Sequence, residues 1–427
     1  MTIYRATVLD TPESPFVGGT LRADADAGIL EQDGVIRARG AIAEVARAHP
    51  NEQVVELRGG LLLPGFVDTH VHYPQVRIIG GIGMPLLEWL ERCALPEEAA
   101  LADAHYAHTV AAEFVSGLVA AGTTSALVFG SHFAGAVDSL FAESTRVGLR
   151  VTTGLVVSDR VLRQDLLSTP SRAYEEGRAL AERWHGHGRT RYAVTPRFSL
   201  SASEPMLESC AGLAKDVEGT WFTSHVNENR DEVAEVVRLF EGSPDYIDTY
   251  DRFGLVGPRS VFAHNVHVLD RELGLLAAQE AWVAHCPTSN SALGSGLFPM
   301  RRHVEAGVRV ALGSDVGAGT GLSLLKEGLQ AYFLQQLLQE EGLPLTSAHL
   351  LYLATRAGAD ALGLEDVGDL SVGRQFDALW VCPPRGSTLE AALAHADGAD
   401  DALSKVFALG GVADTAGVWV GGTRLLG

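Results

Sequence analysis

Short apolar runs alternate with helical patterns through the middle of the chain. The helical patterns are rich in Ala, Leu and Glu, as at 97–120 and 204–217. Strands that alternate with helices indicate βα units around a parallel sheet. Eight such units predict a (β/α)8 barrel, and an open doubly wound sheet ranks second because it would scatter the strand ends along one edge. The predicted strands lie near 61–68, 124–129, 150–157, 191–194, 220–224, 260–263, 281–284 and 309–313.

Both ends of the chain have a different pattern, with short strands separated by turns. At the start, strands are predicted at 3–9 and 54–57, and a hairpin at 28–39 turns at Asp33-Gly34. At the other end, a strand at 378–381 precedes a hairpin at 418–426 that turns at Gly421-Gly422. We therefore expect residues 1–63 and 369–427 to form one discontinuous small β domain, and residues 64–368 to form the barrel.

Composition narrows the function classes. A chain of 427 residues exceeds one ordinary core, and a barrel of ~250 residues with a smaller domain fits. The net charge of −20 disfavours a nucleic-acid partner, because phosphate binding needs a basic face. The four cysteines lie far apart without a C-x-x-C pair, which favours a reducing compartment. No signal peptide or membrane-spanning run is evident, so we expect no membrane association and a cytoplasmic protein.

Polar side chains with metal-binding chemistry follow four of the predicted strands. His70 and His72 form a His-x-His pair, and on a strand residues i and i+2 point to the same side. His225, His264 and Asp315 each end a later apolar run. A lone His-x-His is weak evidence for a metal site, but a parallel barrel would bring all these strand ends to one face. The ordered set therefore predicts a metal centre.

The motifs around these residues resemble the metal-dependent amidohydrolase superfamily, and within it the guanine deaminases. The resemblance runs in order from about residue 55 to 380. It implies a (β/α)8 barrel with a small β-sandwich domain built from both termini, one zinc ion and a homodimer. The motifs are PGFVDTHVHYPQ at 64–75, TPRF at 195–198, SHVNEN at 224–229, HCPTSN at 285–290, LGSGLF at 293–298 and SDVGAGT at 314–320.

Site roles follow from the resemblance position by position. It implies His70, His72, His225 and Asp315 as zinc ligands. His264 matches a histidine beside the metal, and whether it binds the metal directly stays open. Glu228 matches a proton-shuttling carboxylate. Gln75, Arg197 and Phe198 match the residues that bind the purine.

The implied reaction replaces the C2 amino group of guanine by oxygen, giving xanthine and ammonia. Zinc lowers the pKa of a bound water to about 7, which provides a metal-activated water at neutral pH. Asp315 can take the proton of this water, and Glu228 can protonate N3 and later the leaving ammonia. An arginine presents paired donors that suit the O6 and N7 acceptors of guanine, so Arg197 should disfavour adenine. Gln75 can read another edge, and Phe198 can cover the ring.

Three alternative functions compete with guanine deamination. A related deaminase could act on cytosine, a triazine or another purine with the same metal ligands. A non-catalytic scaffold would have lost ligands, and here they and Glu228 are present. Zinc deaminases of the base-editor type need a P-C-x-x-C signature, which is absent. Segment 191–200 has no lysine to bridge two metals, which favours a single ion, and imidazole and carboxylate accept Fe2+ as well as Zn2+.

Overall fold

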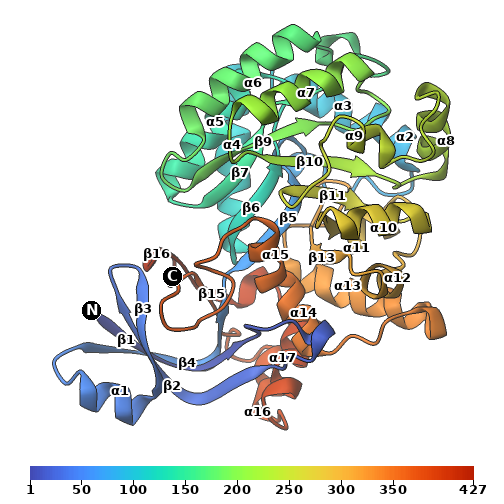
Figure 1. The fold of residues 1–427 in the computed structure, drawn as a ribbon. Coiled ribbons are helices and arrows are strands. Elements are labelled where there is room, and N and C mark those ends of the chain that lie inside the picture. Colours follow the sequence, from blue (N-terminus) through green and yellow to red (C-terminus); the bar gives the residue numbers. More distant parts are fainter.

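Eight parallel strands form a nearly closed barrel in the computed structural model, which describes residues 1–427 (Figure 1). Their hydrogen-bonded order follows the chain from β5 to β13, as expected for successive βα units. The predicted fold class is confirmed, and each predicted barrel strand is present with shifted ends. The strands are β5 (Phe66–His72), β6 (Thr123–Phe129), β7 (Arg150–Gly154), β9 (Thr190–Pro196), β10 (Trp221–Val226), β11 (Ser260–His264), β12 (Trp282–His285) and β13 (Arg309–Leu312), with β8 (Val156–Val157) as a short extension beside β9.

Helices surround this barrel, so its strands are covered on both faces. All residues of β5, β6, β10 and β11 are buried, which explains why these runs are continuously apolar rather than alternating. The longer helices are α4 (Ala104–Ala120), α5 (Ala134–Val147), α6 (Pro170–Trp184), α7 (Glu204–Asp216), α8 (Arg230–Leu239), α10 (Asp270–Ala278), α13 (Leu324–Leu337) and α14 (Ser347–Ala354). The shorter ones are α2 (Leu86–Trp89), α3 (Leu95–Ala100), α9 (Asp248–Asp251), α11 (Pro287–Ala292), α12 (Met300–Glu305) and α15 (Arg356–Ala361).

The helical pattern at 97–120 is divided into two helices. Helix α3 ends at Ala100, and α4 begins after Asp103, whose side chain accepts a hydrogen bond from the backbone N–H of Tyr106. This N-cap satisfies a backbone donor that the start of a helix leaves free. The break turns α3 into a separate element, and it carries a residue that is important for the site, Glu98.

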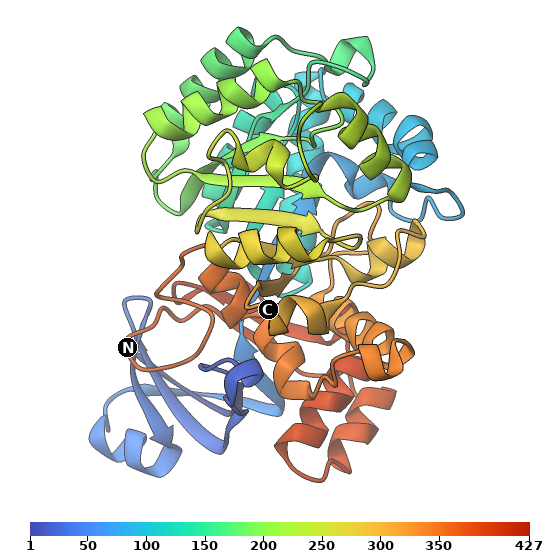
Figure 2. The same ribbon diagram turned by 45° about the vertical axis from the view of Figure 1, so that its right-hand side comes forward.

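The two chain ends form one seven-stranded sheet beside the barrel (Figure 2). Side chains from both ends share its hydrophobic cluster, in which the Tyr4 ring stacks on Phe376 at a centroid distance of 4.7 Å and meets Trp419 edge-on. The expected boundaries at 63/64 and 368/369 stay a prediction. In sheet order the strands are β16 (Thr423–Leu426), β15 (Thr415–Val420), β14 (Ala378–Val381), β4 (Gln53–Pro64), β1 (Thr2–Asp10), β2 (Arg22–Gln32) and β3 (Val35–Ala41), and the helices near them are α1 (Ile42–Ala48), α16 (Thr388–Ala394) and α17 (Ala399–Leu409).

The predicted strand at 61–68 is shared between the two sheets. Residues up to Pro64 pair with β14 in the terminal sheet, and the barrel strand β5 starts at Phe66. Only Gly65 separates them, and a Cβ at this position would lie 2.2 Å from Thr124 Cγ2. A glycine is therefore required where the chain passes from one sheet to the other.

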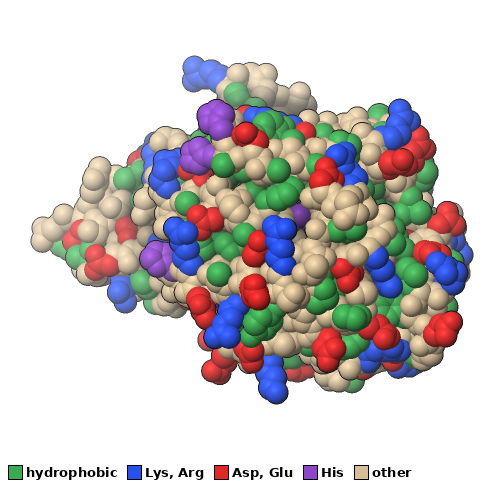
Figure 3. Space-filling model, turned by 90° about the horizontal axis from the view of Figure 1, so that it is seen from above, with side chains coloured by type: hydrophobic (Ala, Val, Ile, Leu, Met, Phe, Trp, Pro, Cys, Tyr) green, Lys and Arg blue, Asp and Glu red, His purple; other side chains and the backbone are tan.

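Acidic and basic side chains are interspersed on the face seen from above, without a continuous region of one charge (Figure 3). Charged side chains of both signs are thus exposed on this face. No helix is both long enough and apolar enough to cross a lipid bilayer.

Candidate active site

The barrel closes between its first and last strands through irregular contacts at their carboxyl ends. The backbone N–H of Asp315 donates to the carbonyl of His70 at 2.8 Å, and the N–H of His72 donates to the carbonyl of Val316 at 3.0 Å. A Cβ on Gly313 would lie 2.8 Å from His70 Cβ, so a larger residue would hold the strands apart. Closure therefore places the His-x-His pair directly beside Asp315.

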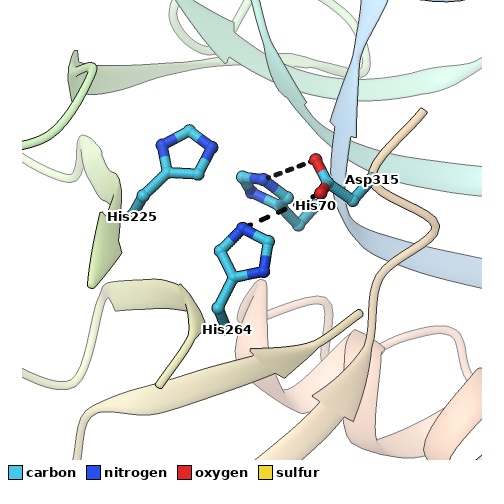
Figure 4. Close-up of side chains that lie close together, drawn as sticks. All are labelled: His70, His225, His264 and Asp315. Atoms are coloured by element: carbon cyan, nitrogen blue, oxygen red, sulfur yellow. Dashed lines mark ion pairs between the residues drawn. The ribbon is translucent and has the colours of Figure 1, made fainter. Parts of the chain in front are cut away.

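Four donor atoms converge where these strands meet. His72 Nε2 lies 3.2 Å from His70 Nε2, from His225 Nε2 and from Asp315 Oδ1, and His70 Nε2 lies 3.3 Å from Asp315 Oδ1. Donor atoms bound to one zinc ion at ~2.0–2.2 Å, with bond angles of about 90–120°, lie roughly 3–3.6 Å apart. The four separations given thus fit one metal ion. Figure 4 shows three side chains of this set together with His264.

The histidines of this cluster are held in the neutral form that metal binding requires. His225 Nδ1 donates to the backbone carbonyl of Arg197 at 2.6 Å, and a carbonyl can only accept, so the lone pair is on Nε2. Burial lowers the pKa of His72 to about 4, although Asp315 acts in the opposite direction. The Phe129 ring lies against all three imidazoles, with centroid distances of 4.5–5.0 Å. The nitrogens therefore face one another in a dry environment.

His264 borders the cluster from the end of β11. Its Nδ1 donates to Asn290 Oδ1 at 2.9 Å, and its Nε2 lies 3.5 Å from Glu228 Oε2 and 3.7 Å from Asp315 Oδ2. His264 belongs with His70, His225 and Asp315 to a group of possible ligands within 4.8 Å of one another, a group that does not include His72. The 3.7 Å contact of His264 with Asp315 is nevertheless longer than the 3.2 Å contact of His72. Both His264 and Asp315 have left-handed backbone, with φ of 71° and 47°. Non-glycine residues rarely adopt this conformation, and such strain concentrates at functional sites.

Glu228 is a buried carboxylate on the loop between β10 and α8. Ser295 Oγ donates to its Oε1 at 3.1 Å. Burial, reinforced by the charge of Asp315, raises the pKa of Glu228 to about 8. The following helix is fixed by a capping box in which Asn229 and Glu232 bond each other's backbone N–H groups. The carboxylate is thus held rigidly and can carry a proton at neutral pH.

A small cavity opens onto these groups. Polar groups of Gln75, Arg197, Glu228, His264 and Asp315 contribute to its lining. The apolar lining consists of Leu86, Trp89, Leu90, Phe198, Leu293 and Ala318. A small, flat, polar-edged heterocycle matches this combination.

All three residues predicted to bind the purine line this cavity. Two of them, Gln75 and Arg197, already form hydrogen bonds with other protein groups. Gln75 Oε1 accepts from the backbone N–H of Gly317 at 3.0 Å, and Gln75 Nε2 donates to Glu98 Oε1 at 2.7 Å. Arg197 Nη1 donates to both carboxylate oxygens of Glu98, at 2.8 and 2.7 Å. The expectation of a free arginine fork therefore changes, because one of its nitrogens has a protein partner.

Comparisons with known proteins agree with this geometry. The model of the amidohydrolase family matches residues 61–425. The chain belongs to the amidohydrolase family. It is 62% identical to the probable guanine deaminase of Deinococcus radiodurans, an alignment that covers 99% of this chain and 98% of the relative.

Solved structures of this amidohydrolase group superimpose closely. The Escherichia coli guanine deaminase has a TM-score of 0.95 and 34% identity, and covers 99% of both chains. The guanine deaminase from C. acetobutylicum, solved with bound guanine in the active site, has a TM-score of 0.92 and 26% identity, and the match covers 99% of both chains.

Sequence reasoning missed three residues that shape the site of this amidohydrolase. Glu98 lies within a helical pattern rich in Glu, where a buried carboxylate cannot be distinguished from a solvated one. Ser295 lies in the LGSGLF motif, which is part of the resemblance to the family. The resemblance assigned no role to the hydroxyl of this serine. Phe129 ends a predicted strand, and its apolar character fits any core position.

Proposed function

We propose that this amidohydrolase catalyses the hydrolytic deamination of guanine to xanthine and ammonia. The observation that carries this proposal is that one cavity is lined by three of the four donor residues, by the buried Glu228, which can be protonated, and by the Arg197 and Gln75 side chains. In the overall reaction the C2–N bond breaks and a C2–O bond forms. Water supplies the oxygen and the protons, so neither an oxidant nor a reductant is needed.

We propose one zinc ion as the cofactor, held by His70, His72, His225 and Asp315. Three neutral imidazoles and a carboxylate are a donor set that zinc accepts, and Fe2+ accepts the same donor types. When bound, the ion supplies Lewis acidity that makes water a usable nucleophile at neutral pH. We place His264 beside this set, because its Nε2 lies 3.7 Å from Asp315 Oδ2, whereas His72 Nε2 lies 3.2 Å from Oδ1.

Glu228 is proposed as the proton carrier of the reaction. Its raised pKa keeps a proton available, and the 3.5 Å approach to His264 Nε2 places the carboxyl at the wall shared by the cavity and the donor cluster. From there it can donate to N3 during attack at C2 and later to the departing amine. Asp315 can accept the proton of the attacking water, and His264 can donate a hydrogen bond to the reacting oxygen when its Nε2 is protonated.

Arg197, Gln75 and Phe198 are proposed to bind the purine. Arg197 offers N–H donors to the O6 and N7 acceptors of guanine. Phe198 and the apolar lining residues can cover the faces of the ring, and such contacts contribute without distinguishing one heterocycle from another. Discrimination by this cavity must therefore come from its polar edge.

Substrate choice is tested by ammonia release from the purified, zinc-loaded protein. Guanine, cytosine, adenine and melamine are offered separately, and each reaction is also followed by its ultraviolet spectrum. We expect rapid release from guanine and at least ~100-fold lower kcat/KM for the others, since a site built to bond a particular polar group strongly rejects analogues without it. Faster turnover of cytosine or melamine would instead identify a deaminase of another heterocycle.

We further propose a homodimer in the cytoplasm, with a role in purine catabolism. The homodimer is tested by light scattering during size-exclusion chromatography. A mass equal to that of one chain at micromolar concentration would contradict it.

A further inference from the structure

A buried carboxylate lies directly behind the wall of the cavity. Glu98 on α3 is only 2% exposed, and it is absent from the cavity lining although two of its partners belong to that lining. Its oxygens accept from Gln75 Nε2 and twice from Arg197 Nη1, at 2.7–2.8 Å. His132 Nε2 lies 3.4 Å from Oε2 as well. Glu98 therefore contacts residues that follow three different barrel strands.

The pair of Glu98 and Arg197 remains charged inside the protein. Burial opposes ionisation of Glu98, but the Arg197 guanidinium, together with His132, holds the pKa of this carboxyl below its usual range. A buried ion pair seldom adds net stability over an apolar pair of similar size, because both charges lose their hydration. Stability alone thus gives little reason for a carboxylate at this position, and its effect on the neighbouring cavity residues is the more specific explanation.

Glu98 restricts what its two partners can offer to a ligand. Since Nη1 of Arg197 is bonded to Glu98, the Nη2 and Nε groups are left for the cavity. The Gln75 amide is also oriented, because a carboxylate accepts only from its NH2 group while the Gly317 N–H donates only to its oxygen. The same carboxylate offsets the arginine charge, so the cavity presents directed donors rather than a freely rotating cation.

We propose that Glu98 is a positioning residue that sets the selectivity for a 6-oxopurine by fixing Arg197 and Gln75. This inference rests on the proposed guanine deamination. It differs from a structural role because it acts through Arg197, whose guanidinium would otherwise have several orientations in the cavity. A merely structural Glu98 would affect stability and leave the ratio between substrates unchanged.

The first test compares the parent enzyme with Glu98→Gln, both zinc-loaded, on guanine and 2-aminopurine, which lacks the 6-oxo group. We expect kcat/KM for guanine to fall about 10- to 100-fold, the range of a lost charge-assisted hydrogen bond, mainly through a higher KM. For 2-aminopurine the change should be several-fold at most. An unchanged ratio between the substrates would overturn the proposal, whereas a parent that releases no ammonia from guanine would overturn the proposed function instead.

A matched control is Asp377→Asn. Asp377 is a buried carboxylate that binds Arg150 Nε at 2.7 Å and Nη2 at 3.2 Å, and neither residue lines the cavity. Its loss should lower the unfolding temperature and leave the guanine to 2-aminopurine ratio within about two-fold of the parent, because no cavity residue is released. An equal loss of selectivity in this control would assign the effect of Glu98→Gln to general destabilisation.

A double variant keeps the proposal testable if Glu98→Gln fails to fold. Arg197→Met leaves Glu98 as a buried carboxylate without its arginine partner, and adding Glu98→Gln removes that charge. We expect the double variant to be more stable than Arg197→Met and to lose at most a few-fold more selectivity, since only the orientation of Gln75 then still depends on Glu98. A further ten-fold loss of selectivity in the double variant would show that Glu98 acts independently. The affinity for guanine can be measured without catalysis, by displacement of fluorescent 2-aminopurine from the metal-free proteins. These affinities should rank the parent and the variants in the same order as kcat/KM for guanine does.

Discussion

The backbone N–H of Asp315 donates to the carbonyl of His70 at 2.8 Å, and Oδ1 of this aspartate lies 3.3 Å from Nε2 of the same histidine. One pair of residues thus closes the barrel and forms one edge of the donor cluster. Barrel closure and metal affinity are coupled for this reason, and four predictions on the metal, the proton carrier and the supporting residues follow from the geometry.

Removal of a donor should abolish metal binding. We expect about one metal ion per chain in the parent protein and loss of activity on chelation. His225→Ala should carry little metal, because it takes one of four donors from a site without a spare. Metal content by atomic emission is the measurement. His185→Ala is the control, since His185 accepts from the Tyr192 N–H away from the site and should leave the metal content unchanged. Full activity of a metal-free preparation would contradict the proposed chemistry.

A residue that orients a metal ligand should contribute almost as much to metal affinity as the ligand itself. Asp68 Oδ1 accepts from the backbone N–H groups of His70 at 3.2 Å and Ser314 at 3.0 Å. Asp68→Ala should weaken zinc affinity by ~10–100-fold, as for other residues that orient ligands. Asp68→Asn keeps an acceptor at Oδ1 and should lose less. Competition with a zinc chelator measures both, and equal affinities in parent and Asp68→Ala would be the contrary result.

Loss of the proton carrier should separate binding from turnover. Glu228→Gln should retain metal and bind guanine, yet lower kcat by ~10²–10⁴-fold, the usual contribution of general acid–base catalysis. The comparison is Glu232→Gln in the first turn of α8, whose buried carboxyl bonds Tyr246 and lies outside the cavity lining. Its kcat should stay within a few-fold of the parent. If both variants behaved alike, Glu228 would have no special part in proton transfer.

Glu232 should make the stability of the metal-free protein depend on pH. Burial and then the charge of Glu228 raise the pKa of Glu232 to about 7, whereas an unfolded glutamate titrates near ~4.3. Between these values the unfolded state binds fewer protons, so the free energy of unfolding falls as pH rises, by about 4 kcal/mol at most. Glu232→Gln removes this effect, so the variant should gain stability relative to the parent between pH 5 and pH 8. Urea unfolding of both proteins at pH 5 and pH 8 measures the free energy of unfolding. If it changed by the same amount in the parent and in Glu232→Gln, the prediction would be wrong.

The barrel could be predicted because its strands are buried on both faces and are therefore visible in the sequence as apolar runs. Helical patterns separate these runs, as βα units require. The sequence also indicated the donor residues, since His70, His72, His225, His264 and Asp315 all end apolar runs. The role of Glu98 could not be predicted in this way. Its partners Gln75 and Arg197 are distant in the chain, and the break after Ala100 that makes α3 a separate helix depends on the Asp103 cap.

The strand boundary at 61–68 could not be predicted for a related reason. Leu61 to Val67 is continuously apolar, and either sheet could bury it. The choice is made by pairing with β14, more than three hundred positions later in the chain, and by the close approach of Gly65 to Thr124. Such long-range pairing leaves no local signal in the pattern of hydrophobic positions.

Closure of the barrel between β5 and β13 has a consequence for the order of events during synthesis. Thr69 Oγ1 bonds the carbonyl of Leu312, 243 residues later in the chain. A ribosome-bound chain therefore exposes its His-x-His segment long before the opposing aspartate emerges, and β14 to β16 follow later still. Contacts of such high sequence separation form slowly. The nascent chain should accordingly acquire its metal late. Until β13 has been synthesised, the apolar first barrel strand lacks one of its partners, and we expect chaperones to bind this exposed segment.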